Sequence, residues 1–314
     1  MTPSFKHILK TGFKLTVSAG LLGISCLMVQ FDTMRESLRH ADLGLLAVSA
    51  LILLLGGFAG AASWFCILRL RLPAISYREV VARHWCGMFF NSFFPSNMGG
   101  DVVKGYLMAR DSGQTGFVIT SLFVDRVLNL IVLLCIGGLA LLLQFNHPWL
   151  AVELLLSLLA VLSVVLFSTR LLRAKCQHWP RVGRYGMVVN LLKPVCELTA
   201  TPRLLFPMLM AALLSQALKI WQNAFVIRAL GLAMPIFCVW FVIPLFGLVS
   251  ALPLSIGGLG LREMVALWLA GPLQLDATHL ITFSLAGHVM VVLVNMLGII
   301  TFMSKNYRHA SSRA

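Results

Sequence analysis

Long apolar runs determine what this chain can fold into. Each contains at least 19 residues with few charges, and about 20 apolar residues are needed for a helix to cross a bilayer. Hydrophobic residues make up 59% of the 314 residues and charged residues only 11%, so lipid is the solvent that this composition fits. We therefore predict an all-α polytopic membrane protein with six spanning helices, at Phe13–Phe31, Leu43–Leu68, Phe117–Phe145, Leu150–Ser168, Leu204–Leu230 and Ile281–Met303.

The distribution of Lys and Arg predicts the orientation. Basic residues gather in segments 6–14, 69–83, 170–203 and 305–313, and short loops rich in Lys and Arg stay in the cytoplasm. We expect a multi-pass protein of the cell inner membrane with both termini cytoplasmic, a basic cytoplasmic connector at 169–203, and an outer loop at 32–42. The formal charge of +14 is then a signal for orientation and lipid head groups, and no nucleic acid partner is predicted.

One motif occurs twice, 158 residues apart: Pro, three residues, Gly-Gly, three residues, and a cation, at 95–104 and 253–262. With the basic segments in the cytoplasm, segment 80–116 must begin and end on the cytoplasmic side of the membrane, and segment 236–270 must begin and end on the outer side. Both segments are therefore predicted to be re-entrant helical hairpins, because broken backbone survives in a bilayer only where protein or a wet cavity surrounds it. We predict a single membrane domain, 1–314, with a first repeat at 43–145, an inverted second repeat at 201–303, and hairpin tips that meet near the midplane.

These residues also resemble a known family, the flippase-like membrane proteins that include the transmembrane domain of lysylphosphatidylglycerol synthase. The resemblance covers nearly the whole chain and implies movement of lipids or lipid-linked head groups across the bilayer. Asn129 stands where members often carry an acid, and no polar stretch is long enough for a soluble aminoacyl-transferring domain, so we expect no lysyl-lipid synthesis. The resemblance is carried by Pro95, Gly99, Gly100, Asp101, Lys104, Asp125, Arg126, Gly257, Gly258, Gly260, Arg262 and Glu263.

The two motifs suggest an anion site at the hairpin tips. A helix that starts after each Gly-Gly pair would offer free N–H groups and the positive end of its dipole, with a cation about one turn in. The alternative is that the cations anchor the helices at the interface and the glycines only permit close packing. Asp101 is placed to cap its helix, and Glu263 is either structural or paired with a cation. The predicted substrate-binding residues are Pro95, Gly99, Gly100, Asp101, Lys104, Pro253, Gly257, Gly258, Arg262 and Glu263.

Polar side chains at helical spacing mark three faces that we expect to line a cavity around the tips. They are Ser121, Asp125 and Asn129; then Gln216, Lys219 and Asn223; then Ser284, His288 and Asn295. Ionisable residues inside membranes are candidates for function, whereas a lone His is more often a hydrogen-bonded helix contact. The candidates for the cavity or for proton coupling are Asp125, Arg126, Asn129, Gln216, Lys219, Asn223, His288 and Asn295.

The chain carries little sign of enzymatic chemistry. Its seven cysteines show no Cys-x-x-Cys spacing, and no phosphate-binding loop for ATP is present. We expect no catalytic residues, metal or cofactor, and the sequence indicates no particular protein partner. The favoured function is translocation of a phospholipid or a polyprenyl-phosphate-linked substrate, whose phosphate lies between the tips. The alternatives are a polyprenyl-phosphate-dependent membrane transferase and a transporter of small anionic solutes.

Overall fold

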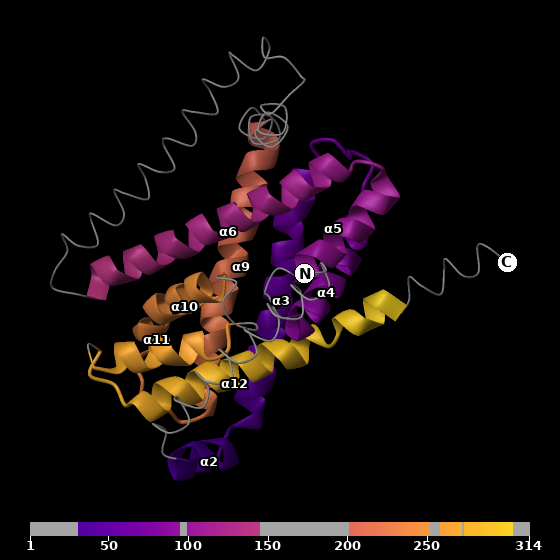
Figure 1. Cartoon of the computed structure of the whole chain (residues 1–314). Helices are drawn as coiled ribbons and strands as arrows, with labels where there is room; N and C mark the ends of the chain where they lie inside the picture. Colours follow the sequence, from indigo (N-terminus) through magenta and orange to yellow (C-terminus); the bar gives the residue numbers. More distant parts are fainter. Residues whose placement is uncertain (1–30, 95–98, 145–200, 252–257, 272, 304–314) are drawn as a thin grey trace, which may run out of the picture. The chain divides into compact units, whose positions relative to one another are not determined.

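The computed structural model describes residues 31–94, 99–144, 201–251, 258–271 and 273–303, and every regular element in these ranges is a helix (Figure 1). The predicted helices at 13–31 and 150–168 and nearly all of the connector lie outside them. The described elements are α2 (Phe31–Arg39), α3 (Leu43–Leu68), α4 (Tyr77–Phe93), α5 (Gly99–Ser112), α6 (Thr115–Gln144), α9 (Pro202–Ala229), α10 (Ile236–Ala251), α11 (Leu261–Ala270) and α12 (Ala277–Asn295).

Four of these helices are long and apolar enough to cross a membrane. The candidate spans are Leu43–Leu68, Thr115–Ala140, Arg203–Ala229 and Ala277–Met303, with mean hydropathies between 1.6 and 2.3. They agree with four of the six apolar runs in the sequence. The prediction of a multi-pass, all-helical membrane protein is confirmed at this level.

The other core helices, α4, α5, α10 and α11, are too short to span. They contain 17, 14, 16 and 10 residues, which at 1.5 Å per residue gives about 26, 21, 24 and 15 Å. A hydrocarbon core is about 30 Å thick. In the sequence, each pair of short helices stands between two long ones.

The helix bounds recur at nearly constant spacing. α4 ends at Phe93 and α10 at Ala251, 158 residues later, and α5 ends at Ser112 and α11 at Ala270, again 158 residues later. The order long, short, short, long therefore occurs twice among the described helices.

The expected outer loop at 32–42 is largely helical, which corrects the sequence prediction. It forms α2, which packs beside α12. Asp32 in the first turn and Arg39 in the last turn both interact favourably with the helix dipole. After α2, the Asp42 carboxylate accepts hydrogen bonds from the Gly44 and Leu45 N–H groups at 2.8 and 3.1 Å, which caps α3.

The chain divides into two compact units. The first comprises residues 1–55, 85–102 and 218–314, and the second comprises residues 56–84 and 103–217. In the first unit Phe246 of α10 stacks on Phe283 of α12 with ring centroids 6.2 Å apart. In the second, Trp64, Met108 and Val118 belong to one buried apolar cluster. Each unit thus has its own core.

Candidate functional site

The second glycine motif begins with a turn that only glycine adopts easily. Gly258 and Gly260 have φ of 87° and 84°, and a Cβ on Gly258 would overlap the Ser250 hydroxyl. α11 therefore starts at Leu261 and not directly after the Gly-Gly pair, which corrects the sequence prediction. Arg262 is consequently the second residue of α11 and does not lie one turn inside it.

Glu263 holds this turn to α12. Its side chain is fully buried, and both carboxylate oxygens accept hydrogen bonds. The Gly260 N–H donates to Oε2 at 2.7 Å and the Ser284 hydroxyl donates to Oε1 at 2.7 Å. The carboxylate thus works as a cap for α11 and as a link between α11 and α12.

Arg262 has a guanidinium group whose Nε finds no acceptor among the described residues. Its guanidinium carbon lies 5.0 Å from the centroid of the Phe246 ring. Within the described part of the chain its Nε is buried and has no acceptor, and it forms no ion pair with the neighbouring Glu263. His288, one turn beyond Ser284 on α12, is half-buried and lies within electrostatic reach of Arg262. Because a buried, unpaired N–H is costly, this side chain is the clearest donor available to an anion.

The first glycine motif lies at the start of α5. The Gly100 N–H donates to Asn91 Oδ1 at 2.7 Å, and a Cβ on Gly100 would overlap the Gly87 carbonyl oxygen. Here the glycine allows α4 and α5 to approach backbone to backbone. Asp101, in the first turn of α5, is buried. Pro95 of this motif, and Pro253 and Gly257 of the second, lie outside the described residues.

Lys104 lies over a buried tryptophan in the second unit. It is 5% exposed, and its Nζ lies 4.8 Å from the centroid of the Trp64 ring. The Trp64 indole N–H donates to Ser121 Oγ at 3.0 Å, which fixes the ring beneath the ammonium group. The first cation, like Arg262, thus lies against an aromatic face.

The polar face predicted on α6 forms a continuous hydrogen-bonded chain. Ser63 Oγ donates to Asp125 Oδ1 at 3.1 Å, and Asn129 Nδ2 donates to the same oxygen at 3.2 Å. Gln216 Nε2 donates to Asn129 Oδ1 at 2.7 Å. The chain joins α3, α6 and α9. Arg126 lies on the exposed side of α6, away from this face.

The remaining predicted residues make contacts within the first unit. Asn223 Nδ2 donates to the Lys219 carbonyl at 2.8 Å and to Gln222 Oε1 at 2.9 Å. Asn295 Nδ2 donates to Ser92 Oγ at 3.0 Å, and Asn295 Oδ1 is buried without a partner among the described residues. Asn295 therefore connects α12 with α4, whereas both hydrogen bonds of Asn223 stay within α9. Gln216, predicted on the same face as Asn223, belongs to the second unit.

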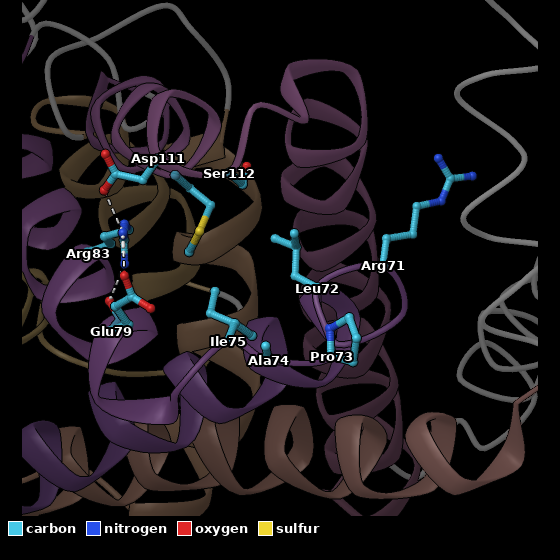
Figure 2. Close-up of a pocket in the computed structure, with 10 residues that line it drawn as sticks. Arg71, Leu72, Pro73, Ala74, Ile75, Glu79, Arg83, Asp111 and Ser112 are labelled. Carbon is cyan, nitrogen blue, oxygen red and sulfur yellow. Dashed lines mark hydrogen bonds and ion pairs between the residues drawn. The ribbon is translucent and has the colours of Figure 1, made fainter.

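Sequence reasoning missed one charged cluster. It treated Arg83 as a loop cation, but Arg83 lies in α4, is 2% exposed, and pairs with Glu79 Oε1 at 2.8 Å and Asp111 Oδ2 at 2.6 Å (Figure 2). These residues line a cavity of about 280 Å³. The i,i+4 spacing of Glu79 and Arg83 was a signal for this pair, whereas Asp111 has no local signal. Trp64 and Phe246, the aromatic supports of the two cations, were missed as well.

No group of three metal-ligating side chains occurs in the described ranges, and the buried acids Asp125 and Glu263 are occupied by hydrogen bonds.

The comparison with known families gives one match. The family described as "Lysylphosphatidylglycerol synthase TM region" matches residues 13–298. No curated protein matches the sequence. Because the match covers most of the chain, and because it contains three of the four candidate spans and most of the fourth, this protein is a member of the lysylphosphatidylglycerol synthase transmembrane-region family.

Proposed function

We propose that the chain translocates lipids or lipid-linked head groups across the membrane and that Arg262 binds their phosphate. The observation that carries this proposal is the Arg262 guanidinium, whose Nε is buried beside Phe246 without a hydrogen-bond acceptor among the described residues. Glu263, the acid that would repel a phosphate, accepts hydrogen bonds at both oxygens. An anion bound to Arg262 would supply the missing acceptor.

Lys104 takes the equivalent part in the first motif. Lys104 and Arg262 each follow the second glycine of their pair by four residues, and each lies against an aromatic ring. A cation inside a membrane is costly, and the Phe246 ring compensates Arg262 only in part, by about 0.5–2 kcal/mol. Two such cations suit a lipid phosphate that passes between an aqueous phase and the bilayer interior.

The proposed architecture is an inverted repeat of six spans and two re-entrant hairpins in the inner membrane. The short α4–α5 and α10–α11 pairs, the repeated order of helix lengths and the basic segments at 69–83 and 170–203 support it. Both termini are then cytoplasmic, and the hairpins enter from opposite sides.

We assign the chain to the carriers rather than to the enzymes. Its buried acids serve helix packing, and no motif for ATP hydrolysis is present. The cargo is a phospholipid or a polyprenyl-phosphate-linked molecule, which moves down its gradient or with protons.

The test is lipid movement in vesicles that contain the purified full chain and a head-group-labelled lipid. The substitution Arg262→Gln removes the charge and should lower the initial rate at least tenfold, since losing a charged hydrogen bond costs about 1.5–3 kcal/mol. The matched control is Arg228→Gln, which removes an exposed arginine from the end of α9 and should leave the rate unchanged. Equal rates for the two variants would refute phosphate binding by Arg262.

A further inference from the structure

The cavity at the open end of the α4–α5 pair lies where lipid head groups are found. One of its walls is the segment 71–75, which directly follows the candidate span Leu43–Leu68. The other walls come from the first turns of α4 and the last turns of α5. The cavity thus begins where a spanning helix reaches the membrane surface.

Two polar groups in this cavity are placed to meet a ligand, and they are complementary. Arg83 Nε is a buried donor without an acceptor in the described part of the chain. The Glu79 side chain accepts from Arg83 at Oε1 and is 44% exposed, so the carboxylate is open to a second donor. A ligand that fits both groups must carry an acceptor for Arg83 and a donor for Glu79.

The charges around the cavity favour a cationic donor. Two carboxylates, Glu79 and Asp111, face the single guanidinium of Arg83. Arg110, which is 47% exposed, reaches Asp111 at 3.2 Å and leaves Glu79 as the less compensated acid. The Arg71 guanidinium points away from Arg83 (Figure 2) and lies 5.3 Å from the Phe117 ring centroid. An ammonium group at Glu79 therefore meets a carboxylate that shares its cation, Arg83, with Asp111.

The rest of the cavity is apolar and lies close to Lys104. Leu72 and Ile75 pack against the buried cluster that includes Met108, and Met108 follows Lys104 by one turn of α5. The cavity therefore borders the face of α5 that carries Lys104. About 280 Å³ is comparable to the smallest small-molecule pockets, which begin near 300 Å³.

We infer that this cavity is a head-group site for lipids that carry a primary amine next to a phosphate, the phosphoethanolamine class. The ammonium group contacts Glu79, a phosphate oxygen accepts from Arg83 Nε–H, and the glycerol end lies on Leu72 and Ile75. The role of the site, loading the lipid that Lys104 and Arg262 then bind, rests on the proposed function. The binding itself does not.

The test is the retention of lipids by the detergent-purified full chain, offered an equal mixture of phosphatidylethanolamine and phosphatidylglycerol with the same acyl chains and read by native mass spectrometry. The wild type should retain phosphatidylethanolamine preferentially. Glu79→Gln keeps the side-chain shape and an acceptor for Arg83 but removes the charge, so it should reduce this preference about fivefold, the upper range for a partly exposed charge pair. Glu36→Gln, at an exposed acid of α2, is the matched control and should keep the preference.

Each other outcome has a definite meaning. A Glu79→Gln variant that selects lipids as Glu36→Gln does would overturn the site. Tighter retention of free phosphoethanolamine than of phosphatidylethanolamine would overturn the lipid as its occupant in favour of a soluble zwitterion. Arg262→Gln should retain the preference even if it moves no lipid, so failure of this site and failure of the proposed transport are distinguishable.

Discussion

Asp125 is a buried carboxylate in an apolar helix, 6% exposed and bonded to Ser63 and Asn129. Removing this acceptor leaves the Ser63 hydroxyl unsatisfied, at a cost of about 1–3 kcal/mol for a buried group, whereas Asn129 Nδ2 keeps its hydrogen bond to the Asp125 carbonyl at 2.8 Å. An amide in the same place still accepts hydrogen bonds. The carboxyl group of Asp125 therefore has two separable properties, its charge and its acceptor oxygen.

The first prediction compares two substitutions at Asp125. Asp125→Leu should destabilise the protein by about 1–3 kcal/mol, because the buried Ser63 Oγ loses its acceptor, whereas Asp125→Asn should cost less than half of that. The measurement is the midpoint of thermal unfolding in one detergent, with Glu36→Gln as the control. If the leucine variant melted at the wild-type temperature, the hydrogen-bonded chain on α6 would carry no stability.

For single residues, the sequence predicts contacts between neighbours on the same helix. The spacing of four between Ser121, Asp125 and Asn129 identifies their common face, because helical geometry alone brings them together. The partners Ser63 and Trp64 come from α3, at a sequence separation of about 60 residues, and no periodicity indicates them. Arg83 was misjudged for a related reason, since a count of charges does not reveal that Asp111, 28 residues away, neutralises it.

Among the elements, α12 has the best-defined start. The Asp276 carboxylate accepts hydrogen bonds from the N–H groups of Thr278 at 2.6 Å and His279 at 3.4 Å. Partial burial raises the pKa of this carboxyl, but the two N–H groups outweigh that effect and hold it below its ordinary value of 3.8. A depressed pKa means that the cap stabilises α12 above the ordinary pKa and that this stabilisation is lost as the pH falls through the lowered value.

The second prediction follows from the lowered pKa of Asp276. Asp276→Ala should destabilise the protein by about 1 kcal/mol at pH 7, and the difference from the wild type should shrink as the pH falls below 3.8. Unfolding midpoints of both proteins at several pH values measure it. Asp276→Asn, which caps without a charge, should lose this pH dependence as Asp276→Ala does but should stay more stable than Asp276→Ala at pH 7. A difference that stayed constant down to pH 3 would contradict the ionised cap.

The helices themselves were largely predictable, and their ends less so. Hydropathy identifies α3, α6, α9 and α12 because spanning runs need about 20 apolar residues. The start of α11 was misplaced, since the pattern Gly-Gly-Leu-Gly does not reveal which glycines have positive φ. α2 was assigned to a loop because its nine residues are too few and too charged for a span, although Phe31, Met34 and Leu38 follow a helical period.

For the whole molecule, the distinguishing property is the side from which each hairpin enters. In the proposed topology the α4–α5 pair begins and ends in the cytoplasm, whereas the α10–α11 pair begins and ends outside. Loop charges indicate this arrangement, and the shortness of the four helices agrees with it.

The third prediction tests it with single cysteines in a background without the seven natural ones. Ser76→Cys and Ser112→Cys flank the first pair, and Ala233→Cys and Gln274→Cys flank the second. A membrane-impermeant thiol reagent added to intact cells should label only the second two. Labelling of Ser76→Cys but not Ser112→Cys, or the reverse, would mean that this segment crosses the bilayer and that the repeat is not inverted.

The glycines on either side of α4 also bear on how the protein can move. A Cβ on Gly100 would overlap the Gly87 carbonyl, and a Cβ on Gly298 would overlap the Trp85 carbonyl, so α4 is held backbone to backbone at two places. Helices in such close contact cannot slide past each other by a residue without a clash. During any opening and closing, the inner half of α4, the start of α5 and the end of the Ala277–Met303 span must travel as one rigid body, and the hinge must lie elsewhere.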